Sequence, residues 1–196
     1  IVCNAGVMNL PERTVVHGQE LQFLTNHVGD FMLVTGLLDH LGERARVVVV
    51  ASGAHRWAPA NGIELDDLTL SRHYTPRSAY GQSKLANILF ARSLSRRFAG
   101  TTKTANALHP GVIATNLARH MGPLVSALMP VASAIALKSV PQGAATQCYL
   151  AAHPSVEGVT GQYFADCNPA KPRRDADDTV LAKRLWDESE KLVARI

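Results

Sequence analysis

Short apolar runs alternate with long helix-forming segments along almost the whole chain, and this alternation is the strongest constraint on its fold. Residues 1–3, 46–50, 104–108 and 161–164 are apolar or β-branched runs typical of buried strands. Residues 19–41, 78–98, 141–152 and 178–193 carry helix signals, from apolar side chains at helical spacing to starting serine or proline residues. Such alternation forms right-handed βαβ units. The sequence therefore predicts an α/β fold: a doubly wound parallel sheet in three layers, built as a single domain over residues 1–196.

The composition fits one globular domain and argues against a nucleic-acid-binding protein. The chain has 196 residues, of which 46% are hydrophobic and 18% are charged, which is enough for a sizeable core. The net charge is +4, and the basic residues are scattered, with arginine doublets only at 96–97 and 173–174. A nucleic-acid-binding surface normally has a denser basic patch interleaved with aromatic side chains, and aromatic residues are only 6% here.

The cysteines and histidines form neither a disulfide framework nor a metal-binding pattern. The three cysteines are far apart and odd in number, which suits free thiols in a reducing cytoplasm. None of the eight histidines pairs at the His-x-x-x-His spacing of a metal site. No secretory signal is expected at the start of the chain. The longest apolar tract, 124–137, contains Pro130 and is too short to span a bilayer. We therefore expect a cytoplasmic protein with no transmembrane segment and no metal.

Polar or turn-forming residues follow three of the predicted strands. Asn4 and Gly6 come after the first strand, Ser52 after the second, and Pro110 with Gly111 after the third. In parallel sheets, ligands bind outside the carboxyl ends of the strands. The long polar stretch 55–78 lies next to these positions in sequence, and long loops in compact domains are usually functional. The sequence therefore predicts a ligand site at this edge of the sheet.

Tyr80 and Lys84 lie four residues apart in a predicted helix and so share one helix face. A free phenol titrates at about 10 and exchanges protons poorly at neutral pH. A neighbouring ammonium favours the phenolate and moves the pKa of the phenol toward neutrality. The pair can therefore act as an acid/base, although this spacing also recurs by chance and gains meaning only from the residues around it.

These residues match, in order, the motifs of one enzyme family. The chain resembles the short-chain dehydrogenases/reductases, whose motifs are an Asn-Asn-Ala-Gly turn, a helix asparagine, a catalytic serine, a Tyr-x-x-x-Lys pair, and a Pro-Gly turn with a threonine. The matching positions here are Asn4, Ala5, Gly6, Asn26, Ser52, Tyr80, Lys84, Pro110, Gly111, Val112 and Thr115. Cys3 replaces the first asparagine of the turn. The resemblance implies a Rossmann-like fold.

Finer sequence details resemble one branch of that family. The segments 46–55, 83–90, 142–146, 161–164 and 185–190, and the insertion that contains Leu65-Asp66-Asp67-Leu68, are similar to those of the retinol dehydrogenases and the WW-domain-oxidoreductase-like group, here as a bacterial member. The apolar segment 117–137 corresponds to the family's substrate lid. An alcohol or carbonyl substrate of apolar character is the implied substrate, and simple packing is the alternative explanation of that segment.

The resemblance also implies a role for each matching residue. Tyr80 would be the general acid/base. Lys84 would lower the pKa of Tyr80 and bind the nicotinamide ribose, and Ser52 would hold the substrate oxygen. Asn26 would hold a water molecule that links Lys84 to solvent. The cofactor-binding set is Asn4, Ala5 and Gly6 near the adenosine half, Tyr80 and Lys84, and Pro110, Gly111, Val112 and Thr115 near the nicotinamide.

The phosphate-binding turn of the family, Thr-Gly-x-x-x-Gly-x-Gly, does not occur in the sequence. We therefore expect the chain to represent an N-terminally incomplete protein, without the first strands and the glycine-rich turn. The choice between NAD(H) and NADP(H) is not encoded in these residues, and NADP(H) is favoured only by the resemblance. The resemblance further implies a homo-oligomer.

Two other functions remain open at this stage. One is a catalytically idle relative that binds cofactor or acts as a scaffold. The other is a reductase of carbon–carbon double bonds on the same fold, similar to protochlorophyllide reductase. His55 and His109 are tempting as bases, but the Tyr80–Lys84 pair already supplies an acid/base, and so we interpret both histidines as scaffold or loop residues.

Overall fold

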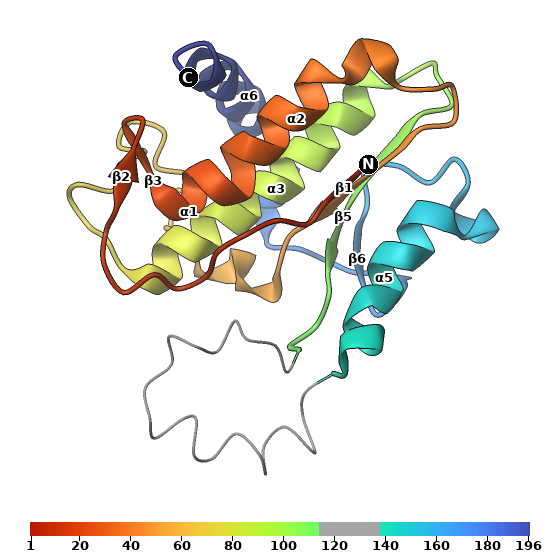
Figure 1. Cartoon of the computed structure of the whole chain (residues 1–196), viewed down its shortest axis with the longest axis horizontal. Helices are drawn as coiled ribbons and strands as arrows, with labels where there is room; N and C mark the ends of the chain where they lie inside the picture. The colour runs from red at the N-terminus through yellow and green to blue at the C-terminus, as the bar shows by residue number, and fades with distance from the viewer. Residues whose placement is uncertain (114–137) are drawn as a thin grey trace.

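A five-stranded sheet lies at the centre of the structure, a computed structural model that describes residues 1–113 and 138–196 (Figure 1). Its strand order is β1-β4-β5-β6-β7, and every neighbouring pair is parallel except β6 with β7. The strands are β1 (Val2–Cys3), β4 (Arg46–Val50), β5 (Thr104–His109), β6 (Tyr163–Ala165) and β7 (Asn168–Pro169). The expected α/β fold with a mainly parallel sheet is confirmed.

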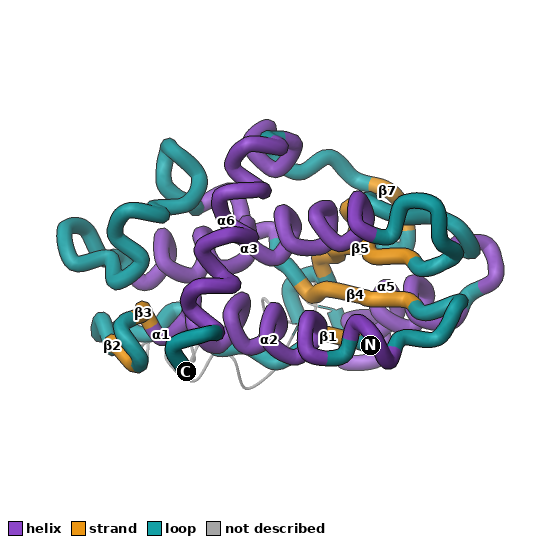
Figure 2. Tube along the Cα trace, turned by 90° about the horizontal axis from the view of Figure 1, so that it is seen from above, coloured by secondary structure: helices purple, strands orange, loops and turns teal. Residues whose placement is uncertain are grey.

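Helices cover both faces of this sheet (Figures 1 and 2). One face carries α1 (Leu21–Phe23), a π-helical stretch (Leu24–Val28), α2 (Gly29–Gly36), α3 (Pro76–Arg97) and α6 (Thr179–Val193). The other face carries α5 (Val140–Ala152). A short 3₁₀ helix, η3 (Gly53–Trp57), follows β4 and packs against α3.

The valines of β4 divide the interior into two apolar layers. Val47 and Val49 belong to the larger core, with Ile88 and Leu89 of α3. Val48 and Val50 belong to the smaller core, whose other members include Leu150 of α5. Successive side chains of a strand point to opposite faces, so a run of valines with both faces covered can be apolar throughout. This is the physical reason why the continuous run predicted a buried strand.

Several element boundaries differ from the sequence prediction. Residues 19–20 form β3 (Gln19–Glu20), which pairs with β2 (Val15–Val16) across a turn in which His17 and Gly18 have φ values of 49° and 73°. Two positive φ values suit the tight turn of a hairpin. The helix therefore begins at residue 21 rather than 19. Helix α3 begins at residue 76 under an N-cap from Thr75, two residues before the start at 78 that the sequence predicts.

The part of the chain that the structure describes contains neither a membrane-spanning helix nor a metal-binding cluster. No helix in residues 1–113 and 138–196 has both the length and the apolar character needed to cross a lipid bilayer. Within the same residues, no three His, Cys, Asp or Glu side chains gather in a way that could hold a metal ion. Cys3, Cys148 and Cys167 are free thiols.

An aromatic cluster joins α2, α3 and α6. Trp186 of α6 lies with its ring centroid 4.8 Å from that of Phe31 and 5.8 Å from that of Phe90. His27 is fully buried beside these rings, and its Nε2–H donates to Ser189 Oγ at 2.9 Å, because Ser189 gives its own proton to the Leu185 carbonyl. Burial lowers the pKa of His27 to about 4, and the Asn87 side chain opposes that shift.

The burial of His27 predicts a loss of stability in acid. An unfolded histidine titrates at about 6.5, so between that pH and the folded pKa only the unfolded chain takes up this proton. We expect His27 to account for a fall of roughly 3 kcal/mol in the free energy of unfolding between pH 7 and pH 4. His27→Gln keeps a donor for Ser189 and cannot titrate there, so it should remove this part of the pH dependence. Urea unfolding at both pH values measures the difference.

The exposed His40 offers a matched control for that measurement. His40→Gln should leave the pH dependence of unfolding as it is in the parent protein. If His27→Gln and the parent lost the same stability on acidification, the assigned role of His27 would be wrong.

Candidate active site

The carboxyl ends of β1, β4 and β5 meet at one edge of the sheet. Cys3 pairs with Val49 in the ladder, and Val50 pairs with Leu108, so the loops that follow these strands are neighbours. Asn4, Ala5 and Gly6 leave β1 there and are exposed. Ser52 follows β4, and Pro110 follows β5. The structure thus gathers the loops that the sequence predicted to form a ligand site.

A close backbone contact brings α3 against the segment that follows Ser52. A Cβ atom added to Gly81 would lie 2.5 Å from the Ala58 nitrogen and 2.8 Å from the Ala54 carbonyl oxygen, closer than real Cβ contacts. Only glycine therefore fits at this contact. Tyr80, the preceding residue of α3, lies next to Ser52 as a result and is only 9% exposed.

Burial dominates the proton affinity of Tyr80. It raises the pKa of the phenol above its ordinary value, and the neighbouring Ser52 side chain opposes this shift. The Lys84 ammonium nitrogen lies 5.8 Å from the centre of the Tyr80 ring. The sequence had predicted that Lys84 lowers the pKa of Tyr80. Here the pKa of the phenol is raised instead, with desolvation as the largest cause, and Lys84 is not among the groups that shift it.

Lys84 is held by the end of strand β4. Its Nζ donates to the Val50 carbonyl oxygen at 2.9 Å, and the Asn87 amide donates to the same oxygen at 3.1 Å. Burial lowers the pKa of Lys84 to about 8, and the negative charge of Asp30 opposes this shift. Asp30 is itself 6% exposed, and burial raises the pKa of its carboxyl to about 7, against the influence of Lys84.

Asn26 ties the loop after β1 to helix α3. Its Oδ1 accepts from the Val7 amide at 2.7 Å, and its Nδ2 donates to the Val7 carbonyl and to Ser83 Oγ, each at 2.9 Å. Ser83 in turn donates to the Tyr80 carbonyl at 2.8 Å. The side-chain amide of Asn26 is thus used in positioning. Its role in holding a water molecule for Lys84 stays a prediction.

Gly6 lies between Asn26 and Lys84. A Cβ atom at Gly6 would approach Asn26 Oδ1 to 2.9 Å and Lys84 Nζ to 3.5 Å. The absence of a side chain at this position leaves the Lys84 ammonium open on that side. Asn26, Gly6, Tyr80 and Lys84 therefore form one group of neighbours, and Ser52 joins them through Tyr80.

The segment after β5 is not hydrogen-bonded to this group within the described residues. Gly111 has a φ of 92°, which favours glycine, and Val112 is 64% exposed. The Pro110 carbonyl accepts from Lys138 Nζ at 3.3 Å. Among residues 1–113 and 138–196, no hydrogen bond joins Pro110, Gly111 or Val112 to Asn26, Ser52, Tyr80 or Lys84. Thr115 and the predicted lid 117–137 lie outside the described residues.

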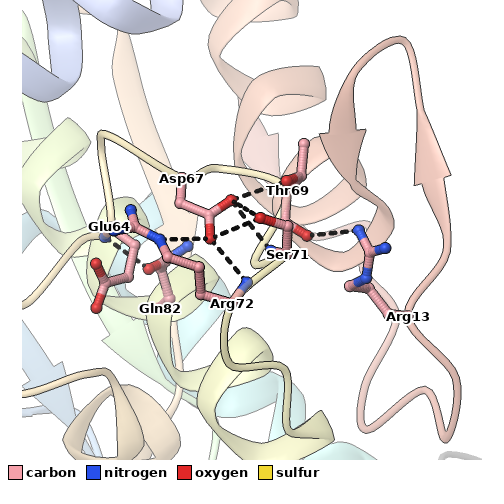
Figure 3. A network of polar contacts seen from close by, with 7 residues as sticks. All are labelled: Arg13, Glu64, Asp67, Thr69, Ser71, Arg72 and Gln82. Atoms are coloured by element: carbon pink, nitrogen blue, oxygen red, sulfur yellow. Dashed lines mark hydrogen bonds and ion pairs between the residues drawn. The ribbon is translucent and has the colours of Figure 1, made fainter.

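The loop before α3 is held by a network around Asp67 (Figure 3). The Asp67 carboxylate accepts hydrogen bonds from the Ser71 and Arg72 amides at 3.0 Å and 3.1 Å and from the Thr69 hydroxyl at 2.8 Å. These bonds hold the pKa of Asp67 well below its ordinary range. Arg13 donates to the Thr69 carbonyl at 3.3 Å and so ties the stretch before β2 to the same loop.

Three residues of this site were not singled out from the sequence. Asp30 lies four residues after Asn26, Ser83 lies three after Tyr80, and Asn87 lies three after Lys84. Residues three or four apart share a helix face, so this spacing was the signal that could have identified them. Each is a polar residue at a position where an amphipathic helix buries its side chains.

The chain is similar to known proteins over nearly its whole length. It is 41% identical over 209 residues to a Streptomyces lividans protein named "Probable oxidoreductase", covering 95% of this chain and 69% of that protein. It is 46% identical over 202 residues to "Short-chain dehydrogenase TIC 32 B, chloroplastic" of Brassica napus, covering 98% of this chain and 63% of the relative. The chain belongs to the short-chain dehydrogenase/reductase family. No protein-family model matches it.

This short-chain dehydrogenase/reductase is also similar to retinol dehydrogenases, as the sequence predicted. It is 42% identical over 197 residues to "Retinol dehydrogenase 14" of Homo sapiens, covering 98% of this chain and 58% of the relative. The chain therefore spans less than two thirds of the length of that protein and of the Brassica napus relative. The predicted family is confirmed.

Solved structures support the same fold. The crystal structure of an uncharacterized protein from Mycobacterium paratuberculosis has a TM-score of 0.76 and 35% identity, covering 98% of this chain and 66% of that one. The angucycline C-6 ketoreductase LanV, solved with bound NADP, has a TM-score of 0.59 at 21% identity, covering 84% and 59%. At that identity, the second likeness concerns the fold alone.

We expect the substitution Gly81→Ala to lower the free energy of unfolding, although Gly→Ala substitutions in helices usually raise it. In an exposed helix, Gly→Ala stabilises by about 1 kcal/mol. At Gly81 the new methyl group would push against the backbone of η3, and we expect a loss of about 1–3 kcal/mol in the free energy of unfolding. Gly36→Ala is the control, because a Cβ at Gly36 meets nothing within 4 Å. Chemical denaturation of both variants measures the contrast, and a stabilised Gly81→Ala protein would contradict the close contact.

The influence of the Asp30 charge on Lys84 predicts a shift in the pKa of the lysine when that charge is removed. Asp30→Asn removes a negative charge that favours the ammonium, so Lys84 should lose its proton at a lower pH than its present value of about 8. NMR of 13C-labelled lysine side chains reports this pKa, and Lys84→Met identifies the signal. Asp39→Asn, a change at an exposed carboxylate, should leave the pKa in place. An unchanged Lys84 pKa in Asp30→Asn would show that the two groups do not interact.

Proposed function

We propose that the protein is an NAD(P)-dependent oxidoreductase that interconverts an alcohol and a carbonyl compound by hydride transfer. The observation that carries the proposal is the buried phenol of Tyr80, which lies near the Ser52 side chain and has the Lys84 ammonium nitrogen 5.8 Å from the centre of its ring. The membership of the chain in a family of dehydrogenases and reductases gives further support.

The residues present fit a nicotinamide cofactor. Lys84 carries three N–H donors, and one of them is used by the Val50 carbonyl. Because glycine has no side chain, Gly6 leaves the space beside Lys84 Nζ open. We propose that the cofactor is held by Asn4, Ala5, Gly6, Tyr80, Lys84, Pro110, Gly111, Val112 and Thr115. Between NAD(H) and NADP(H), we favour NADP(H) only from the resemblance to the retinol-dehydrogenase branch of the family.

The bound nicotinamide supplies or accepts the hydride at the substrate carbon. In the reducing direction, the Tyr80 hydroxyl gives its proton to the carbonyl oxygen, so that one hydride and one proton convert C=O into CH–OH. In the oxidising direction, Tyr80 takes the proton of the alcohol. Because burial raises the pKa of Tyr80, the phenol form predominates at neutral pH, and this form serves carbonyl reduction.

Ser52 suits the stabilisation of the substrate oxygen. Its Oγ accepts from the Ala54 amide at 3.2 Å, which leaves the hydroxyl proton free to be donated. A donor aimed at the carbonyl oxygen stabilises the negative charge that develops there during reduction. Asn26 and Ser83 act through hydrogen bonds that position the loop after β1 against α3.

We propose an apolar alcohol or carbonyl compound as the substrate, acted on in the cytoplasm. The Leu-, Val- and Met-rich segment 117–137 and the similarity to proteins named retinol dehydrogenases support an apolar substrate. The free thiols suit a reducing compartment. A homo-oligomer stays a prediction from the resemblance. The exposed apolar side chains of Met32 and Leu33 on α2 are candidates for its interface.

The decisive experiment follows nicotinamide absorbance with a panel of aldehydes and ketones. It uses the full natural protein with NADPH and with NADH. Tyr80→Phe removes the proton donor and keeps the ring, so we expect kcat to fall by about 10²–10⁴-fold while the cofactor Kd changes little. Tyr149→Phe is the matched control, because Tyr149 lies on α5 and its hydroxyl bonds only to Ser155 in the part described.

Other outcomes would redirect the proposal. Normal turnover by Tyr80→Phe would rule out the proposed proton transfer. Reduction of a conjugated carbon–carbon double bond without reduction of any carbonyl group would favour the double-bond reductases of the same fold. Tight cofactor binding with no turnover on either class would favour a scaffolding role.

A further inference from the structure

Two histidine side chains bind the two polar groups of the peptide bond between Ser52 and Gly53. The Ser52 carbonyl oxygen lies 2.6 Å from His55 Nδ1. The Gly53 amide donates to His109 Nδ1 at 3.0 Å. His55 comes from η3, whereas His109 is the last residue of β5. The peptide that follows Ser52 is therefore held from both sides by separate elements.

The hydrogen-bond partners determine the protonation state of both rings. A carbonyl oxygen can only accept, so His55 Nδ1 must carry a proton. The other nitrogen of His55, Nε2, accepts from the Arg173 amide at 3.1 Å and so carries none. His109 Nδ1 accepts from an amide and also carries none. A neutral imidazole has one protonated nitrogen. His55 is thus the neutral Nδ1–H tautomer, and His109, when neutral, is the Nε2–H tautomer.

We propose that His55 and His109 are positioning residues that clamp the Ser52–Gly53 peptide and so aim the Ser52 hydroxyl. This inference rests on the proposed function, in which Ser52 stabilises the substrate oxygen. The clamp fixes the orientation of the peptide plane, and with it the ψ of 157° at Ser52. Reacting groups need placement to within a fraction of an ångström, and small displacements cost large factors in rate.

The C-terminal part of the chain takes part in the clamp through Arg173. The backbone amide of Arg173 donates a hydrogen bond to His55 Nε2. The guanidinium of the same residue donates to the Ala58 and Pro59 carbonyls at 2.7 Å and 2.8 Å. The segment after β7 is therefore hydrogen-bonded both to His55 and to the loop that follows η3. His55 is 1% exposed and packs edge-on against the Tyr163 ring, with centroids 5.2 Å apart.

The surroundings of both histidines favour the neutral forms. Burial lowers the pKa of His55, the Ser52 carbonyl opposes the shift, and Arg56, His109 and Arg173 lower the pKa further. Burial likewise lowers the pKa of His109, with a further lowering from Lys138 and opposition from Asp166. A proton added to His109 Nδ1 would face the Gly53 N–H, and one added to His55 Nε2 would face the Arg173 N–H. The clamp should therefore open in acid, below the ordinary histidine range of about 6.5.

NMR tests the clamp without any need for turnover. Long-range 1H–15N spectra of the full protein at pH 7 distinguish the two tautomers of each histidine. We expect His55 as Nδ1–H and His109 as Nε2–H, both neutral, and the signals of His55→Asn and His109→Asn identify them. A charged ring, or the opposite tautomer at either position, would overturn the clamp.

Paired substitutions test the effect on Ser52. His109→Asn keeps an acceptor close to the Nδ1 position and cannot titrate, whereas His109→Leu keeps the bulk and removes the acceptor. We expect His109→Leu to lower kcat at least about tenfold with little change in cofactor Kd, and His109→Asn to restore kcat to within about threefold of the parent. In His109→Asn, the acid limb of the kcat profile should move to lower pH. The amide signal of Gly53 should shift far more in His109→Leu than in His109→Asn.

The outcomes separate the clamp from the proposed function. His40→Gln, at an exposed site, controls for removal of a histidine in general. If His109→Leu matched the parent in kcat and in pH profile, the positioning role would be overturned although carbonyl reduction stood. If the protein reduced no carbonyl compound, the proposed function would fail, and the tautomers and the Gly53 amide shift would still decide whether the clamp exists.

Discussion

The close contact between Gly81 and the backbone of η3 is the constraint on which the candidate site depends. It allows α3 to approach the end of β4 so nearly that Tyr80 meets Ser52 and Lys84 reaches the Val50 carbonyl. A single helix thus presents both members of the acid/base pair, and Phe90 on another side of the same helix packs against Trp186 of α6. Because the interior is close-packed, the geometry of the site cannot change without movement of the core.

Burial, more than charge pairing, sets the electrostatics of this site. Tyr80, Lys84 and Asp30 each have a pKa displaced toward the neutral form, and desolvation is the largest cause in every case. Isolated side chains on a helix surface would show the opposite behaviour for a tyrosine beside a lysine. The site therefore holds ionisable groups close to their neutral forms, a condition that suits the movement of a proton more than the binding of a fixed charge.

The sequence predicted those features that follow from local patterns. The apolar run of β4 and the spacing of Tyr80 and Lys84 needed only periodicity and side-chain chemistry. The hairpin of β2 and β3, the N-cap at Thr75 and the raised pKa of Tyr80 depend on turn geometry and on packing that no short window contains. The histidine clamp was the feature least predictable from the sequence. It depends on the orientation of one peptide and on the backbone amide of Arg173, which is 118 residues from His55.

The π-helical stretch Leu24–Val28 carries a further consequence. Here the Gly29 amide bonds to the Leu24 carbonyl five residues earlier, so this turn holds one residue more than an α-helical turn. Removal of one residue would restore a regular helix but rotate the two ends against each other by about 100°. Asn26 could then no longer face Val7 while Phe31 faced Trp186. The extra residue of the π-helical turn lets Asn26 contact Val7 and Phe31 contact Trp186 at the same time. The number of residues in this turn is therefore as constrained as the identity of any side chain.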